Sequence, residues 1–306
     1  MGIFDFLGSI VGHLLWFFFD AVSDYALAIF LLVLVINILL LPFVIKRQKT
    51  MAKNAKFSQK QQELRKKYEK DQKKYNEELA KLYEQEGNPM SGCFVSMVLP
   101  MLILFGVYNA VTRPLQNTLH IPGEKITSAV EVLKNDPSTQ ENFKKGYEEL
   151  QIIRHFPEIK DKLTMLSEEE LADVEEYSSG FNFCGMNLLS NPNGSDFKEM
   201  LWLIPVLTFV IMVLTQLVSQ KTNGADQTQA IGCMKFAPYL MALFFAWSSY
   251  TVPGAVGFYW ILNLLISLAQ TILLGKFYSA KKMNAKEEAA RLALLELNES
   301  SVKKIK

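Results

Sequence analysis

The residues of this sequence that could take part in chemistry are side-chain amides and hydroxyls that interrupt long apolar stretches. An amide donates and accepts hydrogen bonds without carrying charge, so it can hold a polar segment of another chain. Asn263 and Gln270 are seven residues apart, which places them on one face of a helix. A proton-coupled transporter would require an acidic or basic side chain within the membrane, and no such residue interrupts these stretches. The full set is Asn37, Ser96, Asn109, Thr208, Thr215, Gln216, Ser248, Ser249, Asn263, Ser267 and Gln270.

Two interpretations of these polar residues remain open. Each residue can form a plain hydrogen bond between neighbouring helices, which is worth about 0.6 kcal/mol on average inside a membrane. Taken together, several amides on the inner halves of a helical bundle instead indicate a water-filled cavity.

The elements that would position these residues follow from composition. The chain has 306 residues, of which 50% are hydrophobic, and it also carries 32 basic and 31 acidic residues. Apolar and charged residues must therefore be segregated, as in a multi-span membrane protein. A span needs about 20 apolar residues. We predict an all-α integral membrane protein with five transmembrane helices, at residues 25–45, 93–112, 201–219, 234–252 and 253–275.

The last two spans are separated only by Pro253 and Gly254, which predicts a tight turn, and the fourth span is short. Residues 1–24 are predicted to form an amphipathic helix in the membrane interface, on the outside. A sixth span is the alternative, but Asp20 and Asp24 would interrupt a continuous crossing. We expect no removable signal peptide, because no lysine or arginine precedes Lys46 and no small-residue cleavage site follows an apolar core.

Charge predicts the orientation. Residues 46–92 hold thirteen basic and seven acidic residues, so the positive-inside rule makes this segment cytoplasmic. Residues 113–200 hold nine basic and sixteen acidic residues, which agrees with an outside location. The loop 220–233 and the tail 276–306, with eight basic and four acidic residues, would then be inside. The N-terminus is expected outside and the C-terminus inside.

Residues 46–92 are predicted to form a helical hairpin. Each arm has one apolar seam at helical spacing, and Asp71 can cap the second arm, which Gly87 can end. Glu77 and Lys81 have the favourable spacing for an ion pair on one helix face. The alternative is a solvated connector. The seams contain Phe57, Leu64 and Tyr68 in the first arm and Tyr75, Leu79, Leu82 and Tyr83 in the second.

Residues 113–200 are predicted to form a small helical cap. Ser138 with Glu141 and Ser167 with Glu170 have the spacing of capping boxes that start helices. A stripe of Phe143, Tyr147, Leu150 and Ile153 follows the first of them.

The sequence favours no catalytic or cofactor chemistry. Cys93, Cys184 and Cys233 have neither the spacing nor the histidine partners of a metal site, and no disulfide is expected. No phosphate-binding glycine loop is present. We therefore expect a protein that is not an enzyme and that uses no cofactor or metal.

An ordered set of motifs resembles the YidC/Oxa/Alb membrane protein insertases. Pro42 precedes a basic helix with Met51-Ala52-Lys53, and Asn88-Pro89-Met90-Ser91-Gly92-Cys93 opens the second span. The resemblance continues at Pro205 with Gln216, at Met234 to Pro238, and at Pro253-Gly254 before Phe258-Tyr259 and Asn263. It covers the five spans and the hairpin, whereas residues 113–200 are longer than the family loop.

The resemblance implies an insertase and chaperone that accepts the polar tail of a nascent membrane protein in a hydrophilic groove. The apolar segment of this client then enters lipid along spans two and four, without nucleotide hydrolysis. The groove residues would be Asn37, Gln216, Tyr259, Asn263 and Gln270, and the exit path would include Val107 and Phe236. The hairpin would recruit clients through Lys53, Lys60, Arg65, Lys66, Lys67, Lys73 and Lys74.

The implied partners are nascent membrane proteins and the lipid bilayer, with the general secretory channel as a further candidate and with a monomer as the working state. For the basic tail, ribosomal RNA and anionic lipid heads are alternative partners. The implied location is the bacterial plasma membrane.

The chain departs from the family pattern at two places. The family has an arginine in the groove five residues before the proline, where this chain has Asn37, so its groove is expected to rely less on charge attraction. The family's proline and glutamine in span two are not matched at Val95 and Leu99. The competing functions are a secondary transporter or channel, for which we find no inverted repeat, and a membrane-anchored scaffold that recruits partners through the hairpin.

Overall fold

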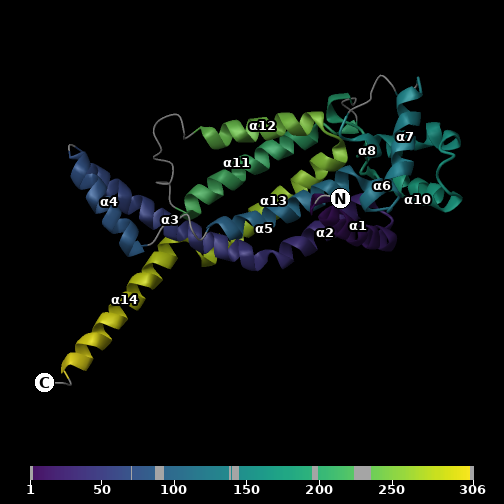
Figure 1. The fold of residues 1–306 in the computed structure, drawn as a ribbon. Coiled ribbons are helices and arrows are strands. Elements are labelled where there is room, and N and C mark those ends of the chain that lie inside the picture. Colours follow the sequence, from purple (N-terminus) through teal and green to yellow (C-terminus); the bar gives the residue numbers. More distant parts are fainter. Residues whose placement is uncertain are drawn as a thin grey trace. The chain divides into compact units, whose positions relative to one another are not determined.

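A computed structural model of the chain describes residues 3–69, 71–86, 93–137, 139, 145–194, 199–223 and 236–303. The predicted all-α class is confirmed, since the strands in these ranges are a single two-residue pair, β1 (Asn182–Phe183) and β2 (Met186–Asn187). Figure 1 shows the helices. They are α1 (Ile3–Val22), α2 (Tyr25–Leu39), α3 (Leu41–Lys67), α4 (Gln72–Glu86), α5 (Cys93–Thr112), α6 (Pro114–Asn117), α7 (Gly123–Asn135), α8 (Glu148–Arg154), α9 (Phe156–Ile159), η2 (Lys160–Lys162), α10 (Glu168–Ser179), η3 (Pro192–Gly194), α11 (Leu203–Asn223), α12 (Ala237–Thr251), α13 (Gly254–Phe277) and α14 (Ala280–Lys303).

The chain divides into two compact units, which are described separately. Unit 1 comprises Met1–Leu39, Leu99–Val213 and Tyr239–Ile266, and unit 2 comprises Leu40–Val98, Leu214–Pro238 and Ser267–Lys306. Helices α5, α11, α12 and α13 contribute residues to both units.

Several helices are long and apolar enough to cross a membrane. Among the described residues, three stretches meet this requirement by length and composition: Asp5–Val22, Leu203–Thr222 and Gly254–Leu297. Helix α2 with the start of α3 makes a fourth if the broken pair counts as one span. Helix α1 thus qualifies as a span by composition, and its interfacial position stays a prediction. Helix α12 has only 15 residues, in keeping with the short fourth stretch of the sequence.

The helix boundaries follow local chemistry. Helix α1 ends before Asp24, whose Oδ1 accepts a hydrogen bond from the backbone N–H of Leu27 over 2.9 Å and so caps α2. The apolar stretch expected to be one helix over 25–45 is broken at Leu40. Pro42 lies in the first turn of α3, where a missing N–H is tolerated. A proline inside a continuous helix would clash with the preceding turn, so the break falls just before it.

The core of unit 1 gathers around the corner between α1 and α2. Tyr25 stacks on Phe181 with ring centroids 4.0 Å apart, and Tyr177 meets Phe19 edge-on at 4.8 Å. The backbone N–H of Tyr25 donates to the carbonyl of Gly180 over 3.0 Å. The end of α10 therefore holds the corner by both ring packing and a backbone hydrogen bond.

The described residues of the segment 113–200 contain helices α6 to α10, and we call this segment the cap. Helix α10 starts at the expected capping box, with Ser167 and Glu170 bonded reciprocally. Leu150 and Ile153 are buried and Tyr147 is half-buried, in agreement with the predicted stripe. Ser138, Glu141 and Phe143 lie outside the described residues. The cap joins the start of α13, because the N–H groups of Gly254 and Ala255 donate to the carbonyls of Ser190 and Leu188.

In unit 2, α3 and α4 form the predicted hairpin, and Figure 1 shows α4 folded back along α3. The rings of Phe57 and Tyr83 lie 5.0 Å apart across the seam. Asp71 caps α4 by accepting from the N–H of Lys74 over 3.2 Å, as expected. Lys81 pairs with Glu78, at 2.7 Å, in place of the expected Glu77. Gly87 lies outside the described residues. Helix α14 packs against α3.

Candidate functional site

Two of the amides singled out from the sequence meet in unit 1. The Nδ2 group of Asn37 on α2 donates to Oδ1 of Asn263 on α13 over 3.3 Å. The same nitrogen donates to the carbonyl of Val33, one turn earlier, over 2.8 Å. Both asparagines are half-buried. The pair is a polar contact between two apolar helices.

A third predicted groove residue lies one helical turn before Asn263. The side chain of Tyr259 is buried, and its hydroxyl donates to the carbonyl of Leu104 on α5 over 3.3 Å. Helix α13 therefore makes polar contacts with both α2 and α5. Asn37, Tyr259 and Asn263 together form what we call the amide cluster.

The hydroxyls in the apolar helices have another role. Thr208, buried on α11, donates to the carbonyl of Ile204 over 2.8 Å, and Ser249 on α12 donates to Ala246 over 2.8 Å. Ser248 donates to Phe244 over 2.8 Å. A hydroxyl that bonds to its own helix needs no partner across the bundle. The hydroxyl groups of these three residues are thus hydrogen-bonded within their own helices.

The remaining predicted groove and exit residues are distributed differently. Gln216 and Gln270 are half-buried and belong to unit 2, whereas the amide cluster belongs to unit 1. Val107 is only 2% exposed in the core of unit 1, whereas Phe236, in unit 2, is 65% exposed. On the same helix as Val107, Leu104 and Phe105 are exposed. Val107 is thus enclosed by its own fold, whereas Leu104 and Phe105 are exposed large apolar residues among the described side chains of α5.

Apolar residues are exposed along most of α12. A helix whose large apolar residues face outward on several sides is stable only against lipid or a partner. The exposed residues of α12 include Leu240, Met241, Leu243, Phe244, Trp247 and Tyr250.

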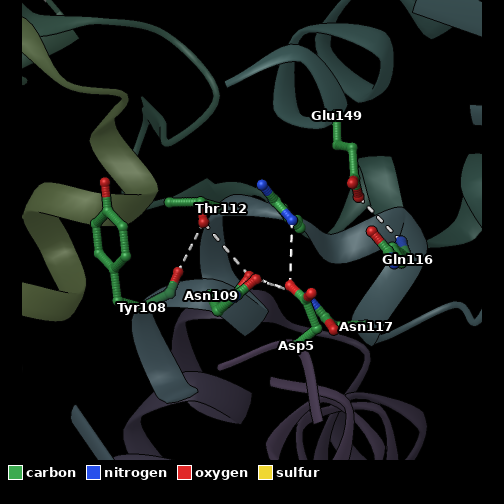
Figure 2. A network of polar contacts seen from close by, with 8 residues as sticks. Asp5, Tyr108, Asn109, Thr112, Gln116, Asn117 and Glu149 are labelled. Carbon is green, nitrogen blue, oxygen red and sulfur yellow. Dashed lines mark hydrogen bonds and ion pairs between the residues drawn. The ribbon is translucent and has the colours of Figure 1, made fainter. Parts of the chain in front are cut away.

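A polar network that the sequence did not reveal ties α1 and the cap to the end of α5 (Figure 2). Arg113 forms an ion pair with Asp5 of α1, with Nη1 and Oδ1 3.3 Å apart. Asn117 of α6 donates to the side chain of Asn109 over 3.1 Å. Glu149 of α8 accepts from the N–H of Gln116 over 2.9 Å, so it caps the start of α6 from another element. Asp5 and Arg113, and likewise Gln116 and Glu149, are far apart in sequence, so no local spacing signals these contacts.

Burial sets the protonation of Glu149. Loss of solvation raises the pKa of its carboxyl group to about 7, against the opposing effects of the Gln116 N–H bond and the Arg113 charge. A carboxyl group that titrates near neutral pH is often a proton donor or acceptor in a site. The Glu149 carboxylate instead accepts a hydrogen bond at the start of α6, which is a structural role.

The hairpin residues predicted to recruit clients are accessible. Lys60 is half-buried and the other six are exposed. Lys74 lies 3.6 Å from Asp71, and the ammonium of Lys67 lies 5.2 Å from the ring centre of Tyr68. Exposed pairs of this kind are worth little, so they would not prevent Lys67 and Lys74 from contacting an acidic partner.

Comparison with known families gives a match over most of the chain. The sequence profile of the family described as 60Kd inner membrane protein matches residues 17–282. The match includes α2, both arms of the hairpin, α5, the cap, and α11 to α13.

Three relatives illustrate the similarity, each described as a membrane protein insertase YidC. The protein of Endomicrobium trichonymphae is 22% identical over 276 residues, which is 90% of this chain and 40% of the relative. That of Caulobacter vibrioides is 32% identical over 143 residues, or 46% of this chain and 22% of the relative. That of Caldanaerobacter subterraneus is 25% identical over 261 residues, or 85% of this chain and 89% of the relative.

The chain thus spans less than half the length of the first two of these relatives. A search of solved structures gave no match.

Proposed function

Because the chain belongs to the 60Kd inner membrane protein family, we propose that it is a membrane protein insertase and chaperone. Its clients are nascent membrane proteins, and it works within the lipid bilayer without nucleotide hydrolysis. The observation that carries the proposal is the amide pair of Asn37 and Asn263 between apolar helices, in a chain whose family match includes both.

The proposed mechanism begins with a polar tail at the amide cluster. A polar segment that enters hydrocarbon loses its hydrogen bonds to water at a cost of several kcal/mol per group. The amides of Asn37 and Asn263 can exchange their mutual bond for bonds to the tail. Gln216 and Gln270 are proposed to add further donors and acceptors. The barrier to entry is lowered because these groups replace part of the lost hydration.

The apolar segment of the client then moves into lipid along α5 and α12. We propose that Leu104 and Phe105 line this path in place of Val107, because they are exposed and Val107 is not. The exposed apolar residues of α12 would also contact this segment, and Phe236 is proposed as a further apolar residue for it. Burial of the client's apolar surface in the bilayer drives this step.

The proposed topology has five spans in the bacterial plasma membrane, with the N-terminus outside and the C-terminus inside. The hairpin α3–α4 is then cytoplasmic, where its exposed lysines attract acidic client segments. The basic tail that includes α14 is proposed to lie on the same side, where the ribosome and the secretory channel are candidate partners. Helix α1 is proposed to lie in the outer interface, with its buried face on α2.

Photo-crosslinking during translation tests the function. A crosslinking residue at Asn263 or Leu104 is expected to capture a nascent single-span client, whereas one at Val174, buried in the cap, should capture none. In cells depleted of their own insertase, growth with and without this protein shows whether it can replace that insertase. Equal capture at all three positions, or no capture at Asn263 and Leu104 together with no rescue, would refute the insertase assignment.

A further inference from the structure

A cavity of about 590 Å³ lies between α3 and the C-terminal helix α14, entirely within unit 2. Four lysines line it and, among the described lining residues, there is no carboxylate. Its volume is in the range of small-molecule sites. The lining residues are Lys46, Lys49, Thr50 and Lys53 on α3, Tyr278 before α14, and Met283, Asn284, Lys286 and Ala290 on α14.

The arrangement of the lining separates charge from apolar surface. Lys46, Lys49 and Lys53 recur at intervals of three and four residues, so they lie on one face of α3. The ammonium of Lys49 lies 5.2 Å from the centre of the Tyr278 ring, a cation–π contact that orients it. Lys286 adds a charge from the opposite helix. Met283 and Ala290 supply an apolar wall beside these cations.

The cavity lies next to the apolar ends of two helices. On α13, Leu273 and Phe277 are exposed immediately before Tyr278, and on α3, Leu41 is exposed before Lys46. Five residues of helix cover about 8 Å. A chain whose apolar helices are in the bilayer therefore holds these lysines about one headgroup depth from the hydrocarbon. Tyrosine, as at Tyr278, is enriched at this level.

We propose that this cavity binds the headgroup of an anionic phospholipid. The lysine ammoniums would hold the phosphate, while Met283 and Ala290 would contact the glycerol backbone and the first methylenes of the acyl chains. Thr50 already donates to the carbonyl of Lys46, over 3.1 Å, so its oxygen is available to accept from a headgroup hydroxyl. This ligand would fix α14 against α3, and the inference goes beyond the insertion of clients.

The location favours lipid over nucleic acid as the source of phosphate. A lipid phosphate reaches the lysines from the neighbouring apolar surface with its acyl chains still in the bilayer. An RNA strand would have to approach the membrane surface and leave the apolar wall of Met283 and Ala290 without a partner. Anionic lipid attraction to a basic segment amounts to roughly fivefold in affinity per lysine.

Native mass spectrometry of the full-length protein in detergent tests the proposal. The protein would receive equal amounts of phosphatidylglycerol and phosphatidylethanolamine, and bound lipid would be counted for three forms. They are the unchanged chain, the triple variant Lys49→Gln/Lys53→Gln/Lys286→Gln, and the matched control Lys66→Gln/Lys67→Gln/Lys73→Gln, which removes the same charge from the hairpin. Thermal unfolding with and without phosphatidylglycerol supplies a second measurement, because a ligand of the native state raises the Tm.

Phosphatidylglycerol is expected to bind preferentially to the unchanged chain and the control, and roughly a hundredfold more weakly to the triple variant. The Tm increase with this lipid should disappear in the triple variant alone. Tyr278→Leu should weaken binding by about fivefold, and Tyr278→Phe, which keeps the cation–π contact, should not. Equal lipid retention by all forms would overturn the proposal. The same measurement with a 20-nucleotide RNA tests the other source of phosphate. Loss of RNA binding in the triple variant, with phosphatidylglycerol binding unchanged, would also overturn the proposal.

Discussion

Asn37 of α2 donates a hydrogen bond to Asn263 of α13 across 3.3 Å. The position where the YidC/Oxa/Alb pattern has an arginine is thus occupied by a neutral donor that is already engaged with a neighbouring amide. In the proposed mechanism, a client tail would compete with a weak bond, worth about 0.6 kcal/mol on average in membranes, and would gain no charge attraction from this position.

Asn37→Arg should therefore favour clients with acidic tails. Insertion into proteoliposomes is expected to rise by roughly fivefold for an acidic tail, equivalent to about 1 kcal/mol of added charge attraction, and to stay unchanged for a neutral tail. Yields are measured by protease protection of the inserted client. An equal gain in insertion for both tails would show that the effect of the arginine does not depend on the charge of the tail.

Glu149 gives the cap a dependence on pH. Its pKa is raised by burial to about 7, so the folded chain binds this proton more tightly than the unfolded chain does. The contribution to stability is fully present below the ordinary carboxyl value and is lost as the pH rises through about 7, with a slope of at most about 1.4 kcal/mol per pH unit.

Glu149→Gln should remove this loss of stability at higher pH, because the amide oxygen can still accept from the N–H of Gln116 and carries no charge. The Tm measured between pH 5 and pH 8 should change less in this variant than in the unchanged chain. Glu148→Gln, at the neighbouring position, removes only a minor repulsive contribution to the pKa of Glu149, so it serves as the control and should retain most of the pH dependence. Identical pH profiles for the Glu149→Gln variant and the unchanged chain would argue against a titrating Glu149.

Gly12 marks a close approach of α1 to α6. A Cβ atom at this position would overlap the carbonyl oxygen of Asn117, which is backbone and cannot rotate away. Gly12→Ala is expected to destabilise the protein by about 2 kcal/mol or more, through overpacking and displacement of α1. Gly123→Ala meets nothing within 4 Å and should be neutral or slightly stabilising. Thermal unfolding in detergent compares the Tm values of the two variants. Equal Tm values would contradict the close packing of α1 against α6 at Gly12.

The hairpin depends on a thin apolar seam. Phe57→Ala removes a buried side chain of α3 and its ring contact with Tyr83 of α4. A 15-residue helix without tertiary contacts is marginal in water. Hydrogen exchange of the α4 amides should accelerate by at least about tenfold, the effect of losing roughly 1.5 kcal/mol of aromatic contact. Lys73→Ala, on the exposed face, should leave the exchange rates unchanged.

Residues with a local structural signature were predictable from the sequence. Asp71 and Ser167 cap helices where expected, and the Pro253-Gly254 turn separates α12 from α13. The break at Leu40 was not predicted, because the apolar run continues through Val44 and Ile45 and hydropathy does not register the interruption.

The site was predictable only where residue type alone carries the signal. Asn37 and Asn263 are amides in apolar helices, and such groups find a partner. Val107 shows the opposite case, because buried and lipid-facing positions of a membrane helix are equally apolar. Contacts such as Asp5 with Arg113 join residues 108 positions apart, and no periodicity connects them.

The hydrogen bond from Tyr25 to Gly180 has a consequence for how the protein is made. Its two ends are separated by roughly 150 residues, so at about 5 to 20 residues per second the ribosome needs on the order of 8 to 30 s to deliver the second end. During that interval the corner of α1 and α2 lacks the aromatic rings that later enclose it. The apolar surface of this corner therefore lacks its partner rings in the newly made chain until the end of α10 has been synthesised.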